Sequence, residues 1–334
     1  MTKGTQQWLD QVTEDIIDPD RPICDPHHHL WDHANSRYLL DQLLLDLRSG
    51  HRIVSTVFVE CSSMYRAGAI EAKQPLGETE FVNGIAAMSA SGQYGKARVC
   101  AGIVGYADLT LGHEVGAVLD EHLRLSDRFR GIRHAVGWDA SPQIRNSHTN
   151  PSEQLLSDER FLKGFSELAK RGLSFDAWLY HPQLEELIVL ADLFEDTIII
   201  LDHFGGPLGI GPYANQRPAI FEQWKRDIKA LAKRPNVVAK LGGLVMPING
   251  FGFHKRDLPA TSDELVASTQ AYYRYMIDTF GADRCMFESN FPVDKQSCSY
   301  AVLWNAFKKM VADGSESEKN GLFHETASRA YRIS

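Results

Sequence analysis

The sequence predicts a single-domain (β/α)8 TIM barrel, an α/β fold in which eight parallel strands alternate with helices. Three observations lead to this prediction. The chain of 334 residues contains eight short runs rich in apolar and β-branched residues, helix-period stretches lie between most of them, and no glycine-serine or charged linker divides the series. Short right-handed crossovers between parallel strands need such an alternation, so one closed barrel accounts for the whole series.

The expected strands are short, and several of them end in a polar residue. They cover residues 23–29, 53–60, 99–106, 131–136, 173–180, 197–203, 237–241 and 285–290. The helix-period stretches cover residues 78–89, 114–125, 158–171, 184–194, 219–233, 262–280 and 300–311. In this scheme residues 1–20 are an N-terminal extension, and residues 21–334 form the barrel.

An open doubly wound sheet is the alternative fold for the same order of elements. A doubly wound nucleotide binder needs a glycine-rich turn after its first strand. Here the first strand ends instead in Asp25-Pro26-His27-His28-His29. The dinucleotide-binding interpretation is therefore weak.

The composition is that of an ordinary globular protein, with 43% hydrophobic and 23% charged residues. The formal net charge of −8 argues against a nucleic acid or an anionic membrane as the main partner, since both need a basic surface. A small-molecule partner fits better. The start of the chain has no apolar signal region, and no apolar run has the length of a membrane helix, so a soluble, cytoplasmic protein is expected.

Two long connections rich in glycine and proline interrupt the pattern. They cover residues 205–218, after the sixth strand, and residues 244–259, after the seventh. Long loops in compact domains are often lids or binding loops, and these two would lie over the mouth of the barrel. We expect them to act as lids or to contact a ligand.

The candidate chemistry begins with His27 and His29, which stand two residues apart on a strand and therefore project to one face. His28 should point the other way. Paired imidazoles can chelate a divalent ion such as zinc, or can hydrogen-bond a substrate oxygen. His203 ends another apolar strand and is followed by Phe204 and two glycines, which allow a ligand to approach the backbone.

Four motifs together resemble the amidohydrolase-2 family, and within it the sugar-lactonase-like branch. They are Asp25-Pro26-His27-His28-His29-Leu30-Trp31-Asp32, Arg130-Gly131-Ile132-Arg133, Asp202-His203-Phe204-Gly205-Gly206 and Ser289-Asn290-Phe291-Pro292. The resemblance spans essentially the whole chain. It implies a barrel that hydrolyses small carboxylic esters, often lactones, while some relatives decarboxylate aromatic or muconate-like acids with zinc and others work without metal.

The family's functional residues carry over at four positions. The resemblance makes His27, His29 and His203 the expected metal ligands and Arg133 the matching arginine of the fourth strand. The eighth strand departs from the family, because Asn290 stands where an aspartate usually activates water and often binds the metal. An asparagine cannot accept that proton, and the lost negative charge leaves metal binding open. Zinc is the ion expected if a metal is bound.

Glu288 is a candidate substitute for the missing base, since it lies two residues before Asn290 and should face the same side of an extended strand. The alternative is a structural ion pair with Lys240, which on an inner strand needs a carboxylate or an anionic ligand. Glu60, at the end of the second strand, is the other candidate base. Arg133 suits a substrate carboxylate or a developing oxyanion, whereas Arg130 suits a helix end or the surface.

Aromatic residues near the strand ends are candidate walls for a ring-shaped substrate, with packing in the core as the alternative. Together with the charged groups above, they complete the expected substrate-binding set of Trp31, Glu60, Arg133, Trp178, His181 and Lys240.

The function expected from these residues is hydrolysis of a small lactone or related ester. In this hypothesis His27, His29 and His203 polarise the scissile carbonyl, and Glu288 or another carboxylate deprotonates water. Two alternatives stay open: a metal-dependent decarboxylase on the same barrel, and a non-catalytic barrel that binds a small acid. Barrel enzymes of this type are often dimers, so a homodimer is the assembly to test for.

Overall fold

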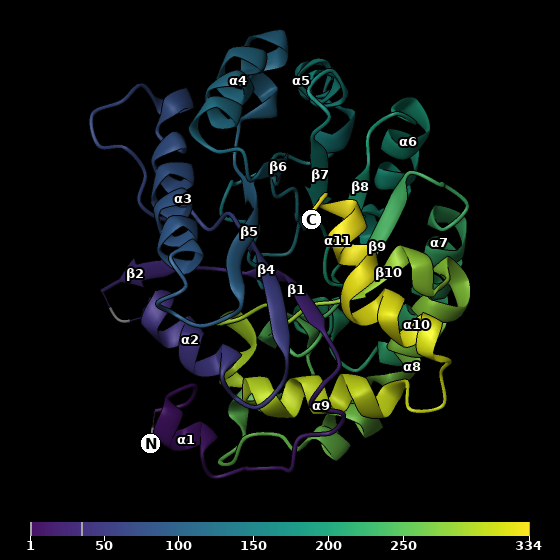
Figure 1. Cartoon of the computed structure of the whole chain (residues 1–334). Helices are drawn as coiled ribbons and strands as arrows, with labels where there is room; N and C mark the ends of the chain where they lie inside the picture. Colours follow the sequence, from purple (N-terminus) through teal and green to yellow (C-terminus); the bar gives the residue numbers. More distant parts are fainter. Residues whose placement is uncertain (1, 35, 334) are drawn as a thin grey trace.

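The computed structural model describes residues 2–34 and 36–333 and contains one eight-stranded parallel sheet that nearly closes into a barrel (Figure 1). An isolated parallel bridge between His28 and Phe291 links the first strand to the segment that follows the last. The predicted (β/α)8 fold is confirmed. In sheet order the strands are β1 (Ile23–His28), β4 (Ile53–Val59), β5 (Arg98–Gly105), β6 (Phe129–Ile132), β7 (Ser174–Ala177), β8 (Ile199–Leu201), β9 (Val237–Leu241) and β10 (Cys285–Phe287).

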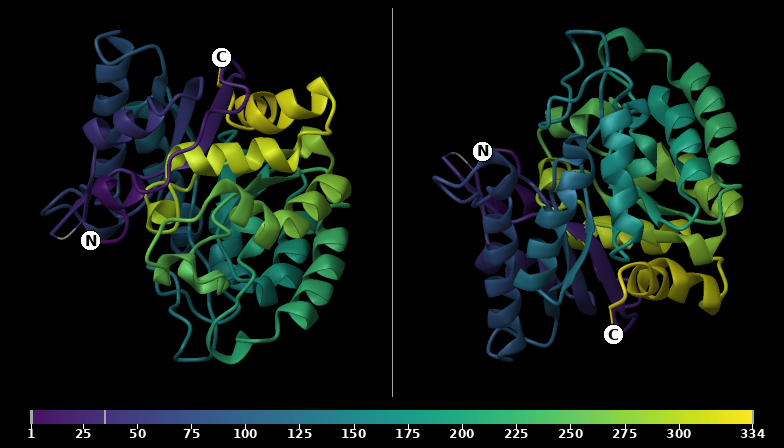
Figure 2. Two further views of the ribbon diagram at one scale, coloured as in Figure 1. Left: turned by 90° about the horizontal axis from the view of Figure 1, so that it is seen from below. Right: turned by 90° about the horizontal axis from the view of Figure 1, so that it is seen from above.

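The helices surround the sheet, as Figure 2 shows from two further sides. Seven of them overlap the predicted stretches: α3 (Leu76–Ala90), α4 (Val115–Leu125), α5 (Glu159–Ala169), α6 (Leu184–Leu193), α7 (Arg217–Leu231), α8 (Ser262–Phe280) and α9 (Tyr300–Met310). The remaining helices are α1 (Gln6–Leu9), α2 (Leu40–Leu47), α10 (Glu316–Asn320) and α11 (Thr326–Ala330), and a short antiparallel hairpin joins β2 (Trp31–His33) to β3 (Ser36–Tyr38).

Local sequence explains where the better-defined helices begin. Thr261 accepts a hydrogen bond from the backbone N–H of Glu264, whose carboxylate accepts one from the backbone N–H of Thr261, so α8 opens with a reciprocal capping box. Asp158 caps the start of α5, because its carboxylate accepts hydrogen bonds from two backbone N–H groups of the first turn. These caps satisfy N–H groups that have no partner within their own helix.

The barrel interior is apolar toward the amino ends of the strands and charged toward the carboxyl ends. A compact inner cluster contains Val57, Val104, Ile200 and Met286, and Tyr331 packs into it next to α11. The Tyr331 hydroxyl donates to Asp176 Oδ2 at 2.6 Å, where the apolar layer meets the charged one. The C-terminal segment thus closes one end of the barrel, so functional groups collect at the other.

Three long loops lie at the carboxyl ends. The backbone N–H of Gly209 donates to Ile248 and the amide of Asn249 donates to Pro207, so loops 205–218 and 244–259 are hydrogen-bonded to each other. The predicted strand 131–136 ends early, at Ile132, and α5 begins only at Glu159; the intervening loop is a third long connection that the sequence analysis missed. The Tyr213 hydroxyl donates to Asp139 Oδ2 at 2.6 Å and joins that loop to loop 205–218.

The N-terminal residues pack against the barrel. Trp8 is buried and its indole N–H donates to the carbonyl of Asp257 at 2.7 Å, while the backbone N–H of Ile17 donates to Asn305. Within residues 2–34 and 36–333, no helix is long and apolar enough to cross a membrane.

Candidate active site

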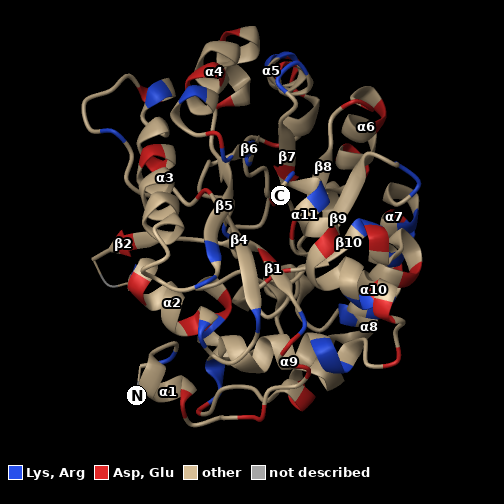
Figure 3. Ribbon diagram, in the orientation of Figure 1, with Lys and Arg blue, Asp and Glu red and all other residues tan. Residues whose placement is uncertain are grey.

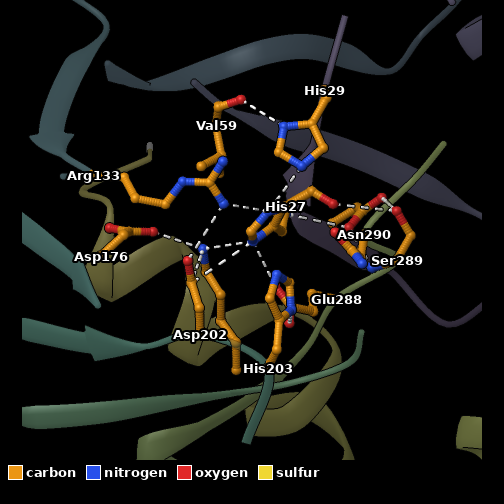
Figure 4. Close-up of polar contacts among 12 residues, drawn as sticks. His27, His29, Val59, Arg133, Asp176, Asp202, His203, Glu288, Ser289 and Asn290 are labelled. Atoms are coloured by element: carbon orange, nitrogen blue, oxygen red, sulfur yellow. Dashed lines mark hydrogen bonds and ion pairs between the residues drawn. The ribbon is translucent and has the colours of Figure 1, made fainter. Parts of the chain in front are cut away.

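The candidate site is a buried cluster of histidines, carboxylates and two cations at the carboxyl ends of the strands (Figure 4). Each side chain comes from a strand or from the residues directly after it. The set consists of His27 on β1 and His29 directly after it, Glu60 after β4, Arg133 after β6, Asp176 on β7, Asp202 and His203 after β8, Lys240 on β9 and Glu288 after β10.

The two histidines of the first strand lie together. The register of β1 against β4 shifts between Asp25 and His28, and His27 Nε2 lies 3.3 Å from His29 Nε2. His29 is fixed from its other side, since its Nδ1 lies 2.8 Å from the carbonyl oxygen of Val59. His28 turns away and contacts the Thr56 hydroxyl at 2.8 Å. The structure therefore separates His28 from the cluster.

Glu288 bridges two histidines that come from different strands. His203 Nδ1 donates to Glu288 Oε1 at 2.6 Å, and His27 Nδ1 lies 2.8 Å from Glu288 Oε2. Burial raises the pKa of this carboxyl, but His203 and His27 outweigh burial and lower the pKa to about 2. Glu288 is therefore ionised at neutral pH. A Cβ on Gly243 would lie 2.3 Å from His203 Nδ1, so the close approach of that backbone needs glycine.

Lys240 finds its counter-ions in two aspartates rather than in Glu288. Its ammonium lies 2.6 Å from Asp176 Oδ2, 3.0 Å from Asp202 Oδ1 and 3.2 Å from His27 Nδ1. Burial lowers the pKa of Lys240, but the aspartates more than reverse this, so the pKa is raised and the lysine stays charged. Burial raises the pKa of Asp176 to about 6 despite the lysine. The sequence analysis missed Asp176, although an isolated carboxyl in an apolar strand was a usable signal.

Arg133 and Glu60 form a second buried pair. Arg133 Nε donates to Glu60 Oε1 at 2.7 Å, Nη2 donates to the carbonyl oxygen of Glu60, and Nη1 lies 3.4 Å from His27 Nε2. The other Glu60 oxygen lies 3.0 Å from Nε2 of His148, which comes from the loop after β6 and was not predicted. Burial raises the pKa of Glu60, and Arg133 and His148 lower it to about 2. Because both oxygens are occupied, the contacts favour Glu60 as a group that orients Arg133 rather than as a base.

Asn290 lies beside the cluster with a different partner. Its side-chain amide donates to Asp294 Oδ1 at 3.3 Å, and its backbone N–H donates to the carbonyl of His27. The neighbouring Ser289 hydroxyl donates to Asp25 Oδ2 at 2.6 Å. These bonds hold the segment after β10 against the first strand and leave Glu288 as the carboxylate that meets the histidines.

Two of the three aromatic candidates contact the histidines. Trp178 packs edge-on against His203 with ring centroids 5.0 Å apart, and Trp31 stacks on His29 at 5.7 Å. His181 instead accepts from the backbone N–H of Leu208 and contacts the Tyr213 ring. The structure thus brings Trp31 and Trp178 to the cluster and places His181 against loop 205–218.

The residues present fit a divalent cation. Ligand atoms of His27, His203 and Glu288 lie within 4.8 Å of one another, a set in which Glu288 replaces the His29 of the sequence prediction. Glu288 Oε2 is buried without a hydrogen bond despite its short distance to His27, and both Asp202 oxygens also lack hydrogen bonds among the described residues. Lys240 and Arg133 lie 3.0 and 3.7 Å from the two Asp202 oxygens, so the opening for a metal ion is Glu288 Oε2, which the ion would contact together with His27 and His203.

The fold and the site together define a (β/α)8 barrel with a histidine–carboxylate centre at the carboxyl ends of its strands, the arrangement of an amidohydrolase-type barrel. Residues 24–333 match the family model described as Amidohydrolase. The chain belongs to the amidohydrolase-2 family, as its motifs suggested.

Two curated relatives show how similar the chain is to known proteins. The chain is 35% identical to the uncharacterised protein y4mH of Sinorhizobium fredii, over 94% of this chain and 99% of the relative. It is 25% identical to an L-fucono-1,5-lactonase of Burkholderia multivorans, over 79% of this chain and 80% of the relative. The family is thus clear, whereas the activity named for the lactonase is carried by a distant relative.

Solved structures of low sequence identity share the fold. An amidohydrolase from Burkholderia multivorans with bound zinc has a TM-score of 0.71 at 22% identity and covers 93% of this chain and 99% of its own. A 5-carboxyvanillate decarboxylase from Sphingomonas paucimobilis has a TM-score of 0.54 at 14% identity and covers 94% and 100%. The same barrel therefore occurs in proteins described as an amidohydrolase and as a decarboxylase.

Proposed function

We propose that this protein is a hydrolase that opens a small lactone, or cleaves a related carboxylic ester, with an activated water. The observation that carries the proposal is the ionised Glu288 bonded to His203 and in contact with His27. The lactonase relatives support the substrate class, and the zinc-bound structural neighbour supports zinc as the ion.

His203 is the group best placed to take a proton from water. Glu288 accepts the Nδ1 proton of His203, which fixes the imidazole in the tautomer whose Nε2 carries a free lone pair. A carboxylate behind the ring also stabilises the imidazolium that forms when Nε2 accepts a proton. The pair can therefore act as a general base, although the usual aspartate is replaced by Asn290.

Arg133 and Lys240 are the two cations that could stabilise an oxyanion formed during hydrolysis. Arg133 is held by Glu60 with one guanidinium nitrogen next to His27, and Lys240 lies on the opposite side of His27. Fixed positive groups in a site that excludes water stabilise a developing oxyanion more strongly than the same groups in solution. His27, His203 and Glu288 could instead hold a divalent ion, which would use the lone pair of His203, so that water activation and carbonyl polarisation would come from the ion and not from His203 as a base.

The proposal is tested by measuring metal content by mass spectrometry and by a pH-indicator screen of sugar lactones, with L-fucono-1,5-lactone among them. A lactonase acidifies the medium in proportion to substrate, and we expect acidification that Glu288→Gln abolishes. Chelation before the screen shows whether a metal is needed. Consumption of protons with release of carbon dioxide would identify a decarboxylase instead, and ligand-dependent thermal stabilisation without turnover would identify a binding protein.

A further inference from the structure

A cavity of about 510 Å3 lies at the amino ends of the strands, at the opposite end of the barrel from the histidine cluster. It is formed by the last turn of α3, the first residues of β5 and β6, and Ile333 near the C-terminus. Its volume is in the range of small-molecule sites. The proposed reaction does not use this cavity, although Arg130 in its lining belongs to one of the four family motifs.

Positive charge dominates its lining. Lys96, Arg98, Arg128 and Arg130 contribute four cations, and Asp127 is the one acidic residue among the lining residues. The Asp127 side chain is 88% exposed and already pairs with Arg128 at 3.1 Å. The protein as a whole has a net charge of −8, and its acidic and basic residues are mixed over the helices in Figure 3. A local excess of cations around one cavity is therefore not explained by composition.

Arg130 is the most informative of these cations. Its Nη1 donates to the carbonyl oxygens of Asp127 and Phe129, its Nε is buried without a hydrogen bond, and no carboxylate of the described residues forms an ion pair with it. Arg332 adds a further cation, since its guanidinium donates to the carbonyl of Arg130 at 3.1 Å. Burial and then the charge of Arg332 lower the pKa of Arg130. The guanidinium is thus oriented by backbone carbonyls, and among the described residues no carboxylate lies within ion-pair distance of it, although Asp127 is near enough to raise its pKa.

Besides Asp127, the C-terminal end of α3 opposes an anion, because its carbonyls would repel it. These carbonyls have partners of their own. Met88 and Ser89 accept from the backbone N–H of Ser91, and Ser89 also accepts from that of Gly92. The helix end is therefore largely satisfied, and the groups left to contact a ligand are the cations and a wall of small apolar side chains, Ala86, Ala90, Ala97 and Ala101.

We infer that this cavity binds a small organic phosphate, with Arg98, Arg128 and Arg130 around the phosphate group and the organic part against the alanine wall. A guanidinium presents a planar set of donors that matches phosphate oxygens, and several such groups match a dianion better than a monoanionic carboxylate. The cavity is also larger than inorganic phosphate needs, which favours a ligand with an organic part. This site is independent of the proposed hydrolysis.

The test is isothermal titration of the full chain, at low ionic strength, with inorganic phosphate and with phenyl phosphate. We expect one site per chain with tighter binding of phenyl phosphate, weakened by added salt. Arg130→Gln and Arg98→Gln should each weaken binding by about tenfold or more, because each removes a charged hydrogen-bond donor. Arg226→Gln, on the exposed side of α7, removes the same charge far from the cavity and should leave binding unchanged.

Several outcomes would overturn the inference. Binding that is unchanged in both Arg130→Gln and Arg98→Gln would place the ligand elsewhere, and no binding of either probe would remove the site altogether. Equal affinity for the two probes would exclude the organic phosphate. Arg98 is exposed, so its variant is expected to fold even if Arg130→Gln does not, and the melting temperature of each variant checks this.

Discussion

Replacing Glu288 by glutamine tests the catalytic proposal most directly. The variant keeps the shape of the side chain and one acceptor oxygen but removes the charge that contacts His27 and His203. Without that charge, His203 Nε2 becomes a weaker base and an imidazolium at His203 loses its counter-ion. General base catalysis contributes about 10²- to 10⁴-fold, so kcat/KM should fall by a factor in that range, or about 3–5 kcal/mol of transition-state stabilisation.

The loss of stability in the Glu288→Gln variant should depend on pH in a direction that the pKa of Glu288 determines. The folded-state pKa of Glu288, about 2, lies below the ordinary value of 4.5 for a glutamate, so this group stabilises the native protein above the unfolded-state pKa, and the stabilisation is lost as pH falls through the folded-state pKa. The Glu288→Gln variant lacks this contribution. Its melting temperature should therefore lie below that of the wild type at neutral pH, and the difference should shrink as the pH is lowered through 4.5 toward 2.

The assay is the initial rate with whichever lactone the indicator screen identifies, together with scanning calorimetry across pH. Glu222→Gln is a matched control, because Glu222 has an exposed side chain and pairs with Lys225 on the surface of α7. The control should keep wild-type kcat/KM within about twofold, since exposed ion pairs contribute little. If Glu288→Gln also kept kcat/KM within about threefold, general base catalysis by the Glu288–His203 pair would be refuted.

Three further variants test the rest of the site. Lys240→Met removes the ammonium that neutralises Asp176 and Asp202 and should cost about 3–5 kcal/mol, with a larger fall in melting temperature at about pH 8 than at about pH 5, because protonation relieves the repulsion between them. A fall independent of pH would contradict this charge assignment. Gly243→Ala places a methyl group against His203 and should reduce kcat/KM by about 10²-fold or more, and an unchanged rate would show that the contact is dispensable. Asn290→Asp removes the amide that donates to the buried Asp294 and should lower stability by about 1–3 kcal/mol, measured by urea unfolding; an unchanged midpoint would show that this hydrogen bond is dispensable.

The strand–helix order was predictable because strands and helices differ in the spacing of their apolar residues, and this spacing can be read from the local sequence. The hairpin from Trp31 to Tyr38 was missed because its residues are mostly polar and exposed, so no buried period marks it. The helix Leu40–Leu47 was also not predicted, although its buried leucines recur at helical spacing. Element ends were the weakest point, since β8 stops at Leu201 and His203 lies in a tight turn with positive φ, beyond the strand that was expected to carry it.

It was harder to predict which side chains of the site pair with each other than to predict which residues belong to the site. Residues at the carboxyl ends of barrel strands converge, so His27, His203 and Lys240 could each be placed near one centre from sequence. Which carboxylate meets which cation depends on distances across the barrel mouth. Lys240 pairs with Asp176 and Asp202 because β7, β8 and β9 are consecutive in the sheet. His148 comes from a loop without any period, so no sequence pattern marked it.

The charge balance of the cluster bears on the metal. Four buried carboxylates, Glu60, Asp176, Asp202 and Glu288, accompany two permanent cations, Arg133 and Lys240. Buried charges are costly unless matched, so two further positive charges are needed at a pH where all four carboxylates are ionised. A divalent ion at the His27–His203–Glu288 group supplies both at the place where a buried carboxylate oxygen lacks a hydrogen bond. Two protonated imidazoles would supply the same charge, with burial and Lys240 lowering the pKa of His27 and Glu288 and Asp202 raising it. The cluster can thus accommodate a dication although Asn290 replaces the aspartate that the sequence comparison expected, since Glu288 supplies a negative charge two residues earlier in the chain.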